Sequence, residues 1–352
     1  MLKLPAYTAT PNWDMSSDTV TRPSGEMLAA MLAAPVGDDV FHEDPTVVAL
    51  EQRIAALCNK PAALFCTSST LSNQLAIRTH LCSPPESLIC HAQSHIFQHE
   101  SAGASMHSQA MMIPVAPATT DNLTVEDVRR AFVWPEPVGL SAPTNLVALE
   151  NTLSGALMPI EDIRAISEFT RAQGAKVHLD GSRLWNAAVA EGRELSAYAT
   201  HVDSLNLCLS KGMGCPVGAM LVGDEAFIER ARRFRKAFGG GWRQAGILAA
   251  AGLYAIEHVW PTMRESHRLA KKLADALAAL GFVLVLPPDT NMVVVEGPPA
   301  VASSATMLID SVQERGVRLS PVYQGSLRIV LHHQISEECV DIVIDTARRM
   351  FG

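Results

Sequence analysis

The feature that most restricts the fold of this chain is the alternation of short apolar runs with helical patterns over its first two thirds. Seven runs have the length and composition of buried strands, and they cover residues 62–65, 86–90, 110–115, 145–151, 176–180, 205–210 and 219–223. Apolar strands separated by helices predict a mostly parallel sheet that helices cover on both faces. We therefore expect an α/β fold.

Helix signals lie between these runs. Asp44 followed by Pro45 has the form of an N-cap with proline at the first helical position. The sequence TVED at 124–127 resembles a capping box. A further helix places Ile160, Ile163, Ile166 and Phe169 on one face and stops near Gly174.

The last third of the chain has a different pattern. A long helix with leucines at 269, 273, 277 and 280 ends at Gly281, and short strand-like runs follow at 282–286, 291–296, 317–322 and 327–333 around one further helix. This pattern predicts a smaller α+β domain. We expect residues 1–249 to form an N-terminal arm with a large domain, and residues 250–352 to form the small domain.

Composition excludes several classes of protein. The net charge of −8 gives no electrostatic footprint for nucleic acid. The N-terminus lacks the continuous apolar core of a signal peptide. The apolar run 204–223 contains Lys211, Asn206, Pro216 and four glycines, so we expect no membrane span. Seven scattered cysteines without a C-x-x-C pair favour a reducing compartment, and we expect a cytoplasmic enzyme.

Lys211 is the only charged residue of that apolar run. A lysine at a strand end can pack its stem and reach water with its ammonium group. Alternatively, desolvation lowers its pKa and makes it an imine-forming nucleophile. Pyridoxal phosphate is the usual partner of such a lysine, and it also needs a carboxylate for its pyridinium nitrogen, donors for its phosphate and an aromatic face.

Each of these needs has a candidate in the sequence. Asp180 ends the strand KVHLD, at the sheet edge where ligands bind in open α/β sheets, although it could also be a turn or cap residue. The sequence TSSTLSNQ at 67–74 is a small-hydroxyl turn that suits a phosphate or an ordinary N-cap. In HAQSHIFQHE, His91, His95 and His99 would share one face of a regular helix and could bind zinc, although no H-E-x-x-H motif is complete.

Many collinear motifs together resemble the L-threonine aldolase family of pyridoxal-phosphate enzymes. They are SSDTVTRPSGEM (16–27), GDDVFHEDPTV (37–47), TSSTLSNQLAIRTH (67–80), AQSHIF (92–97), LENT (149–152), HLDGSRLWNA (178–187), LSKGMGCPVG (209–218), GGGWRQAG (239–246) and LRIVLHH (327–333). The resemblance implies fold type I, with a mostly parallel sheet in a large domain and a smaller C-terminal α+β domain. It also implies cleavage of L-threonine or L-allo-threonine to glycine and an aldehyde.

The resemblance assigns roles to individual residues. It implies that Lys211 holds the cofactor as an imine and that Asp180 pairs with the pyridinium nitrogen. It further implies that His95 stacks on the cofactor ring, and that Ser69 and Thr70 hold the phosphate. Residues implied for the substrate carboxylate are Ser17, Arg183 and Arg328. Family members are usually tetramers with shared sites, so the resemblance implies a homo-oligomer, a dimer or a tetramer, in which Arg243 is the residue that a neighbouring subunit would lend.

Several positions depart from the family pattern. The usual S-G-T turn is Ser68-Ser69-Thr70, a usual tyrosine is Phe41, and a usual arginine is Ser16. Where the family supplies a histidine after E-N-T, this chain has Leu153 and Ser154. Without that imidazole, His95 or an ordered water would have to take the proton of the substrate hydroxyl.

Three other functions are compatible with the sequence. An alanine racemase on the same scaffold breaks the Cα–H bond and needs no hydroxyl base. A Ser-Lys hydrolase could use Ser210 and Lys211, although neighbouring residues on a strand point to opposite faces. A protein that binds the cofactor without turnover is the third.

Overall fold

The computed structural model describes residues 13–117, 121–301, 303–323 and 325–352, and these form two compact units. The larger unit is Arg22–Thr262, and the smaller unit contains the described residues up to Thr21 together with Met263–Gly352. The expected boundary at residues 249 and 250 falls inside helix α11 (Gly246–His258), and the structure divides the chain after this helix. Whether the two units are independent domains stays a prediction.

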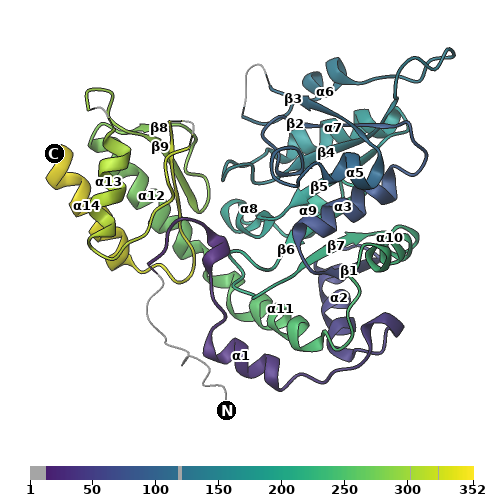
Figure 1. Cartoon of the computed structure of the whole chain (residues 1–352), viewed down its shortest axis with the longest axis horizontal. Coiled ribbons are helices and arrows are strands. Elements are labelled where there is room, and N and C mark those ends of the chain that lie inside the picture. The colour runs from purple at the N-terminus through teal and green to yellow at the C-terminus, as the bar shows by residue number, and fades with distance from the viewer. Residues whose placement is uncertain (1–12, 118–120, 302, 324) are drawn as a thin grey trace. The chain divides into compact units, whose positions relative to one another are not determined.

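The larger unit is built on a seven-stranded sheet with the strand order β1-β7-β6-β5-β4-β2-β3 (Figure 1). Its strands are β1 (Ala62–Cys66), β2 (Ser87–His91), β3 (Met111–Val115), β4 (Thr144–Glu150), β5 (Lys176–Gly181), β6 (Ser204–Cys208) and β7 (Ala219–Gly223). Strands β2 to β6 are mutually parallel, and β7 is antiparallel to both β6 and β1. Six strands therefore run in one direction, which confirms the mostly parallel sheet.

Helices pack against this sheet, and the long helix α3 (Ser69–His80) contacts β1, β4, β5, β6 and β7. The other helices of the larger unit are α1 (Gly25–Leu32), α2 (Pro45–Leu57), α4 (His95–Gln98), α5 (Gly103–Ser108), α6 (Val125–Ala131), α7 (Ile160–Ala172), α8 (Leu184–Glu191), α9 (Leu195–Ala199), α10 (Glu225–Ala237) and α11, with short 3-10 helices η2 (Asp39–Phe41) and η3 (Trp260–Thr262). The predicted helix starts are confirmed. Asp44 accepts hydrogen bonds from the amides of Thr46 and Val47, and Thr124 and Asp127 form a capping box.

The smaller unit has a three-stranded antiparallel sheet of order β10-β9-β8. Its elements are η1 (Asp18–Val20), α12 (Met263–Ala279), β8 (Val283–Leu284), β9 (Met292–Glu296), α13 (Ser304–Gln313), β10 (Leu327–Val330) and α14 (Glu337–Phe351). Leucines 269, 273 and 277 of α12 pack in one core with β9, β10 and α14, as their spacing predicts.

Two predictions for this unit are wrong. The run 317–322 is not a strand of the sheet: its Arg318 forms only an isolated bridge with Asp14, because the segment 13–15 hydrogen-bonds there and to Val330. The second wrong prediction concerns the helices after β9. The pattern predicted one helix there, whereas the structure has two, α13 and α14, and α14 was not predicted. Its polar first turn, EEC, follows the cap residue Ser336, whose hydroxyl accepts from the amide of Cys339.

Within the described residues, no helix is long and apolar enough to cross a bilayer. The run 204–223 is instead the antiparallel pair β6 and β7 with its connection. The prediction that the N-terminus carries no signal peptide rests on residues 1–12, which lie outside the described part of the chain.

Candidate active site

The carboxyl ends of the parallel strands bring several of the predicted site residues of the larger unit to one edge of the sheet. Strand β4 ends at Glu150, β5 carries Asp180 one residue before its end, and β2 ends shortly before His95. The turn from β1 into α3 lies at the same edge, because β1 runs in the same direction as β6. Ligands bind at this edge in open α/β sheets.

Lys211 lies in the connection between β6 and β7, which closes through a hydrogen bond from the amide of Leu209 to the carbonyl of Gly218. Strand β6 ends at Cys208, two residues before the predicted end. A turn follows, closed by a 2.9 Å hydrogen bond from the amide of Gly214 to the carbonyl of Lys211. The argument that Ser210 and Lys211 point to opposite faces of a strand therefore does not apply.

Asp180 is buried and has several donors around its carboxylate. Oδ1 accepts from Asn206 Nδ2 at 2.9 Å and from the amide of Ser182 at 3.0 Å, and Oδ2 accepts from Asn73 Nδ2 at 2.8 Å. Burial alone would raise the pKa of Asp180, but the Lys211 ammonium, the hydrogen bonds from Asn206 and Ser182, and the charge of His95 leave it below its usual value. The site thus holds a buried anion at neutral pH.

His95 is the first residue of α4, and its ring is part of the same cluster. Its Nδ1 lies 2.8 Å from Oε1 of Glu100, whose side chain is fully buried, while the imidazole itself remains about one third exposed. The hydrogen bond with Glu100 raises the pKa of His95 against the opposing effect of burial. Because Glu100 occupies Nδ1, Nε2 is the nitrogen left for other chemistry.

Glu150 is a neighbour of Asp180 in the sheet, and the two residues are register partners of β4 and β5. Its Oε2 accepts a 2.7 Å hydrogen bond from the amide of His95. Burial, and then the negative charge of Asp180, raise the pKa of Glu150 to about 8. Glu150 therefore carries a proton at neutral pH, although sequence reasoning assigned it no role.

The start of α3 fits a phosphate group. Ser68 is the N-cap and accepts from the amide of Leu71 at 3.1 Å, so its hydroxyl is engaged within the helix. Ser69 is buried, and its hydroxyl oxygen has no hydrogen-bond partner in the protein. Thr70 is exposed in the first turn. A helix N-terminus with an orphaned buried hydroxyl beside it suits an anion.

Comparison with known proteins identifies the family. The beta-eliminating lyase family model matches residues 14–297. The low specificity L-threonine aldolase of Saccharomyces cerevisiae is 41% identical over 340 residues, which is 96% of this chain and 86% of that protein. The low specificity L-threonine aldolase of Escherichia coli K12 is 40% identical over 92% of this chain and 95% of its own length. The chain belongs to the threonine aldolase family.

Two further likenesses bear on fold and function. The solved structure of Leishmania major threonine aldolase has a TM-score of 0.81 and 20% identity, and the match covers 96% of this chain and 99% of that one. At this identity the likeness concerns the fold, and it confirms the predicted fold type I of pyridoxal-phosphate enzymes. Alanine racemase TOXG of Cochliobolus carbonum is 34% identical over 94% of this chain and 86% of its own length.

Two of the arginines to which the resemblance assigns a role lie in the larger unit. Arg183 is the partly buried residue just before α8, three positions after Asp180. Arg243 is exposed, and its Nη1 donates a 2.7 Å hydrogen bond to Asp38. Trp242 beside it packs on Phe65 with ring centroids 5.0 Å apart. The GGGW segment therefore lies against the end of β1, next to the turn into α3.

The other two substrate candidates lie in the smaller unit. Ser17 is the N-cap of η1, where its hydroxyl accepts from the amide and the hydroxyl of Thr19 at 3.2 and 2.9 Å. Arg328 is an exposed residue of β10, in register with Val294 of β9. Their contact with a substrate carboxylate stays a prediction.

The zinc hypothesis for the three histidines is wrong, because the helix that it requires is not formed. His91 ends strand β2 and its Nδ1 accepts from the amide of Gln93 at 2.9 Å, while α4 begins at His95 and ends before His99. The rings of His95 and His99 are in contact, with their centroids 5.6 Å apart.

Besides Glu100 and Glu150, four further residues that sequence reasoning missed connect to this site. They are Asn73 and His80 of α3, His178 of β5 and Ser204 of β6. A signal was present: polar residues recur at spacing two on one face of each strand, at Lys176, His178 and Asp180 in KVHLD and at Ser204 and Asn206 in SLN, while the other face is apolar.

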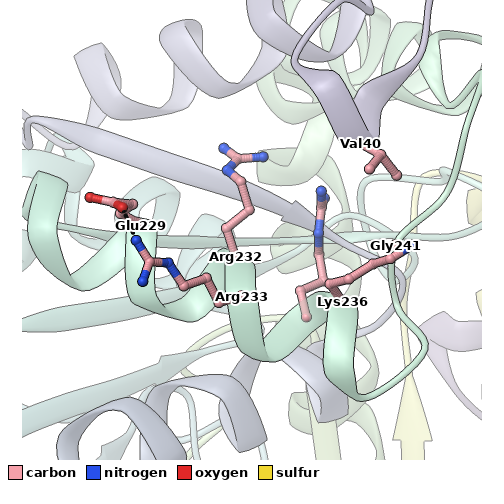
Figure 2. Close-up of a pocket in the computed structure, with 7 residues that line it drawn as sticks. Val40, Glu229, Arg232, Arg233, Lys236 and Gly241 are labelled. Carbon is pink, nitrogen blue, oxygen red and sulfur yellow. Dashed lines mark hydrogen bonds and ion pairs between the residues drawn. The ribbon is translucent and has the colours of Figure 1, made fainter.

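A separate cavity of about 420 Å³ lies beside α10 (Figure 2). It is lined by Val40, Glu229, Arg232, Arg233, Arg235, Lys236 and Gly241. Three of its guanidinium groups are paired within the protein, with Glu51, Glu229 and Asp39. Lys211, Asp180 and His95 do not line it, so it is distinct from the candidate site.

Proposed function

We propose that this chain is a pyridoxal-phosphate-dependent carbon-carbon lyase that cleaves L-threonine and L-allo-threonine to glycine and acetaldehyde. The observation that carries the proposal is the grouping of Lys211 and His95 around Asp180. The charges of Lys211 and His95 both lower the pKa of the buried Asp180 carboxyl group. Threonine aldolases that are 40% and 41% identical over nearly the whole chain support the same activity.

Five side chains would hold the cofactor, and one of them is His95, whose imidazole would stack on the cofactor ring. Lys211 supplies an amine for the covalent link, and Asp180 supplies the anion that keeps a proton on the pyridine nitrogen. Ser69 and Thr70 supply hydroxyls at a helix N-terminus for the phosphate. When bound, the cofactor accepts the electron pair that is released as a bond to the substrate Cα breaks.

The protein's own part in the reaction is to orient the substrate and move a proton. The guanidinium groups of Arg183 and Arg328, with the hydroxyl of Ser17, would bind the carboxylate of the amino acid. His95 would take the proton of the β-hydroxyl at Nε2, since Glu100 holds its other nitrogen. This base replaces the imidazole that the family has where this chain has Leu153 and Ser154.

Alanine racemisation is the second candidate function. The observations that favour it are the missing histidine and the 34% identity with an alanine racemase. Removal of a Cα proton needs no base for a hydroxyl, so the loss would matter less for this reaction.

Purified protein loaded with pyridoxal phosphate decides between the two functions. We expect acetaldehyde and glycine from L-threonine and L-allo-threonine, and only minor formation of D-alanine from L-alanine. Lys211→Ala is the control for both reactions. Fast racemisation with negligible aldehyde would overturn the lyase proposal.

We also propose a homo-oligomer, a dimer or a tetramer, in which Arg243 serves the site of a neighbouring subunit. Arg243 has an exposed side chain, and Phe41 close to it in η2 is 67% exposed. Exposed aromatic and arginine side chains are typical of interfaces.

A cytoplasmic location is supported by the seven free cysteines, six of which are buried.

A further inference from the structure

A chain of hydrogen bonds, buried except for the partly buried first one, leads from the far end of α3 to the candidate site. Its members are, in order, His80, Ser204, His178, Asn73, and then both Asp180 and Glu100. The periodicity of the elements brings these groups together. Asn73 and His80 are seven residues apart on α3, which is two helical turns, so they share a face.

The sheet supplies the other half of the chain. His178 and Asp180 are two residues apart on β5 and therefore point to the same face. The register places His178 beside Ser204, and Asp180 beside Asn206. The polar face of α3 therefore meets a polar row on two strands that are otherwise apolar.

Asn73 fixes the direction of the hydrogen bonds. Its Nδ2 lies 2.9 Å from Glu100 Oε1 and 2.8 Å from Asp180 Oδ2. Carboxylates only accept, so the amide must present its NH₂ group to them and its oxygen to His178. His178 Nε2, 3.0 Å from that oxygen, is therefore the protonated ring nitrogen.

The same direction continues to the end of the chain. Burial lowers the pKa of His178 to about 4, so the neutral ring has a bare Nδ1 that accepts from Ser204 Oγ at 2.8 Å. The Ser204 oxygen accepts in turn from Nε2 of His80, also at 2.8 Å. Burial, and then His178, lower the pKa of His80 to about 3, so this ring is neutral as well. Every donor in the chain thus points toward the two carboxylates.

We propose that Asn73 is a positioning residue of this site, and that its amide, oriented by His178, Ser204 and His80, holds the carboxylates of Asp180 and Glu100 together. One oxygen of each carboxylate and one ring nitrogen of His95 lie within 4.8 Å of one another. Two carboxylates so close repel each other, and one of them takes up a proton unless donors lie between them. Asn73 provides both donors from a single nitrogen. The expected effect of Asn73 on turnover rests on the proposed function, whereas its effect on the stability of the protein does not.

The effect of removing Asn73 depends on the groups that face Asp180. They are the Lys211 ammonium from the β6–β7 connection, His95 of α4, Glu150 of β4, His178 of β5 itself, and Glu100 after α4. The cations keep their places in an Asn73→Leu variant, whereas the donors between the carboxylates disappear. The pKa of Asp180 should therefore rise in that variant.

The test compares Asn73→Leu with Ser72→Ala, measured both without and with pyridoxal phosphate. Ser72 is a matched control, because it is the neighbouring residue of α3, is fully buried and has a hydroxyl without a hydrogen-bond partner. In the protein without cofactor, Asn73→Leu should lower the melting temperature most at neutral pH. This deficit should shrink toward about pH 5, because protonation of a carboxylate relieves the repulsion. The deficit of Ser72→Ala should not depend on pH.

In the loaded protein, Asn73→Leu should lower kcat by about 10- to 100-fold with little change in KM, the range expected for a lost hydrogen bond to a charged group. A pH-independent melting deficit together with an unchanged kcat would overturn the proposal. If the protein has no lyase activity at all, the melting data still test the hydrogen-bond chain by themselves.

A second pair of variants tests the far part of the chain, and it decides the matter if Asn73→Leu does not fold. Ser204→Ala removes the donor to His178 and should lower kcat by about 2- to 10-fold, as expected for a neutral hydrogen bond. It should also give a smaller melting deficit with the same pH dependence. Ser204→Thr keeps the hydroxyl and should restore both. Equal behaviour of the two Ser204 variants would contradict the positioning role.

Discussion

The amide of Asn73 donates a 2.8 Å hydrogen bond to Oδ2 of Asp180, although the two residues are 107 positions apart in the sequence. The contact exists because α3 crosses the sheet and places its polar face over the end of β5. The Asp180 carboxylate, which the proposed cofactor requires, therefore accepts hydrogen bonds from three elements. The donors are Asn73 of α3, Asn206 of the neighbouring strand β6, and the amide of Ser182 in the turn after β5. The predictions below ask what each part of this site contributes.

Lys211→Ala should abolish the covalent link to pyridoxal phosphate, because the variant has no amine for the imine. Reduction of the loaded protein with borohydride, followed by peptide mass spectrometry, should place the cofactor on Lys211 in the wild type and nowhere in the variant. Lys236→Ala, which changes the basic cavity instead, is the control and should retain the label. A label on another lysine would remove Lys211 from its proposed role.

Asp180→Asn should still bind the cofactor but should lower turnover by about 10²–10³-fold, the range for losing one preorganised electrostatic contact. A neutral amide cannot keep a proton on the pyridine nitrogen. Cofactor content measured by absorbance and kcat measured with L-threonine separate the two effects. Turnover close to that of the wild type would mean that another carboxylate performs this task, and Glu150 is the neighbour to examine next.

Much of this fold could be predicted, because each strand and most helices carry a local pattern. The starts of α2 and α6 and the strands β1 to β7 follow from caps and apolar runs, which depend on neighbouring residues only. The run 317–322 could not be predicted correctly, since its partner is the segment 13–15, about 300 positions away in sequence. The position of Lys211 in a turn, past the end of β6, was likewise not evident from its apolar flanks.

The site was predicted in part for the same physical reason. Asp180 was found because it ends an apolar strand, and His95 because of the family motifs. Asn73 and Glu100 were missed, because a buried amide and a buried carboxylate in helical or turn segments look like solvated residues until the sheet is placed beside them. Polar residues at spacing two in β5 and β6 were the available signal, and they indicate one polar face of the sheet.

Arg328→Lys should chiefly weaken substrate binding and raise KM about tenfold, as expected when a charged hydrogen bond is lost. Lysine keeps the positive charge but cannot make the two parallel hydrogen bonds of a guanidinium group with a carboxylate. Steady-state kinetics with L-threonine should show a nearly unchanged kcat. An unchanged KM would place Arg328 outside the substrate site.

Glu150→Gln should become increasingly stabilising, relative to the wild type, as pH rises. The pKa of Glu150 is raised to about 8, so the folded protein holds a proton that the unfolded chain releases above its ordinary pKa. The wild type therefore loses stability from this group as pH rises from about 4.5 to 8, and glutamine removes that loss.

Melting curves of the protein without cofactor, recorded across this range, measure the effect. The exposed Glu257, paired with Arg53 at the surface, provides the control variant Glu257→Gln, which should show no such trend. A difference between Glu150→Gln and wild type that stays constant with pH would mean that the carboxyl of Glu150 is ionised in the folded protein.

The last prediction concerns the base for the substrate hydroxyl. Leu153 is buried and lines a small cavity together with Glu150, His91 and Met158. Ser154 next to it is exposed and has a positive φ of 51°, which histidine tolerates better than most residues do. Histidine at 154 therefore restores an imidazole without filling the cavity, whereas histidine at 153 would have to be buried beside Glu150.

If the chain is a lyase that lacks this base, Ser154→His should raise the rate of acetaldehyde release from L-threonine. General-base catalysis is typically worth about 10²–10⁴-fold, so even a poorly placed imidazole should give a measurable gain. Ser154→Asn, which adopts the same backbone conformation without an imidazole, is the control and should give none.

The variant His95→Asn, made in the wild-type background, should lower the rate of acetaldehyde release if His95 is the present base. Racemisation of L-alanine in deuterated water should be less affected by this variant. A chain in which Ser154→His changes nothing, and in which alanine exchanges its Cα hydrogen faster than threonine is cleaved, would act mainly as a racemase.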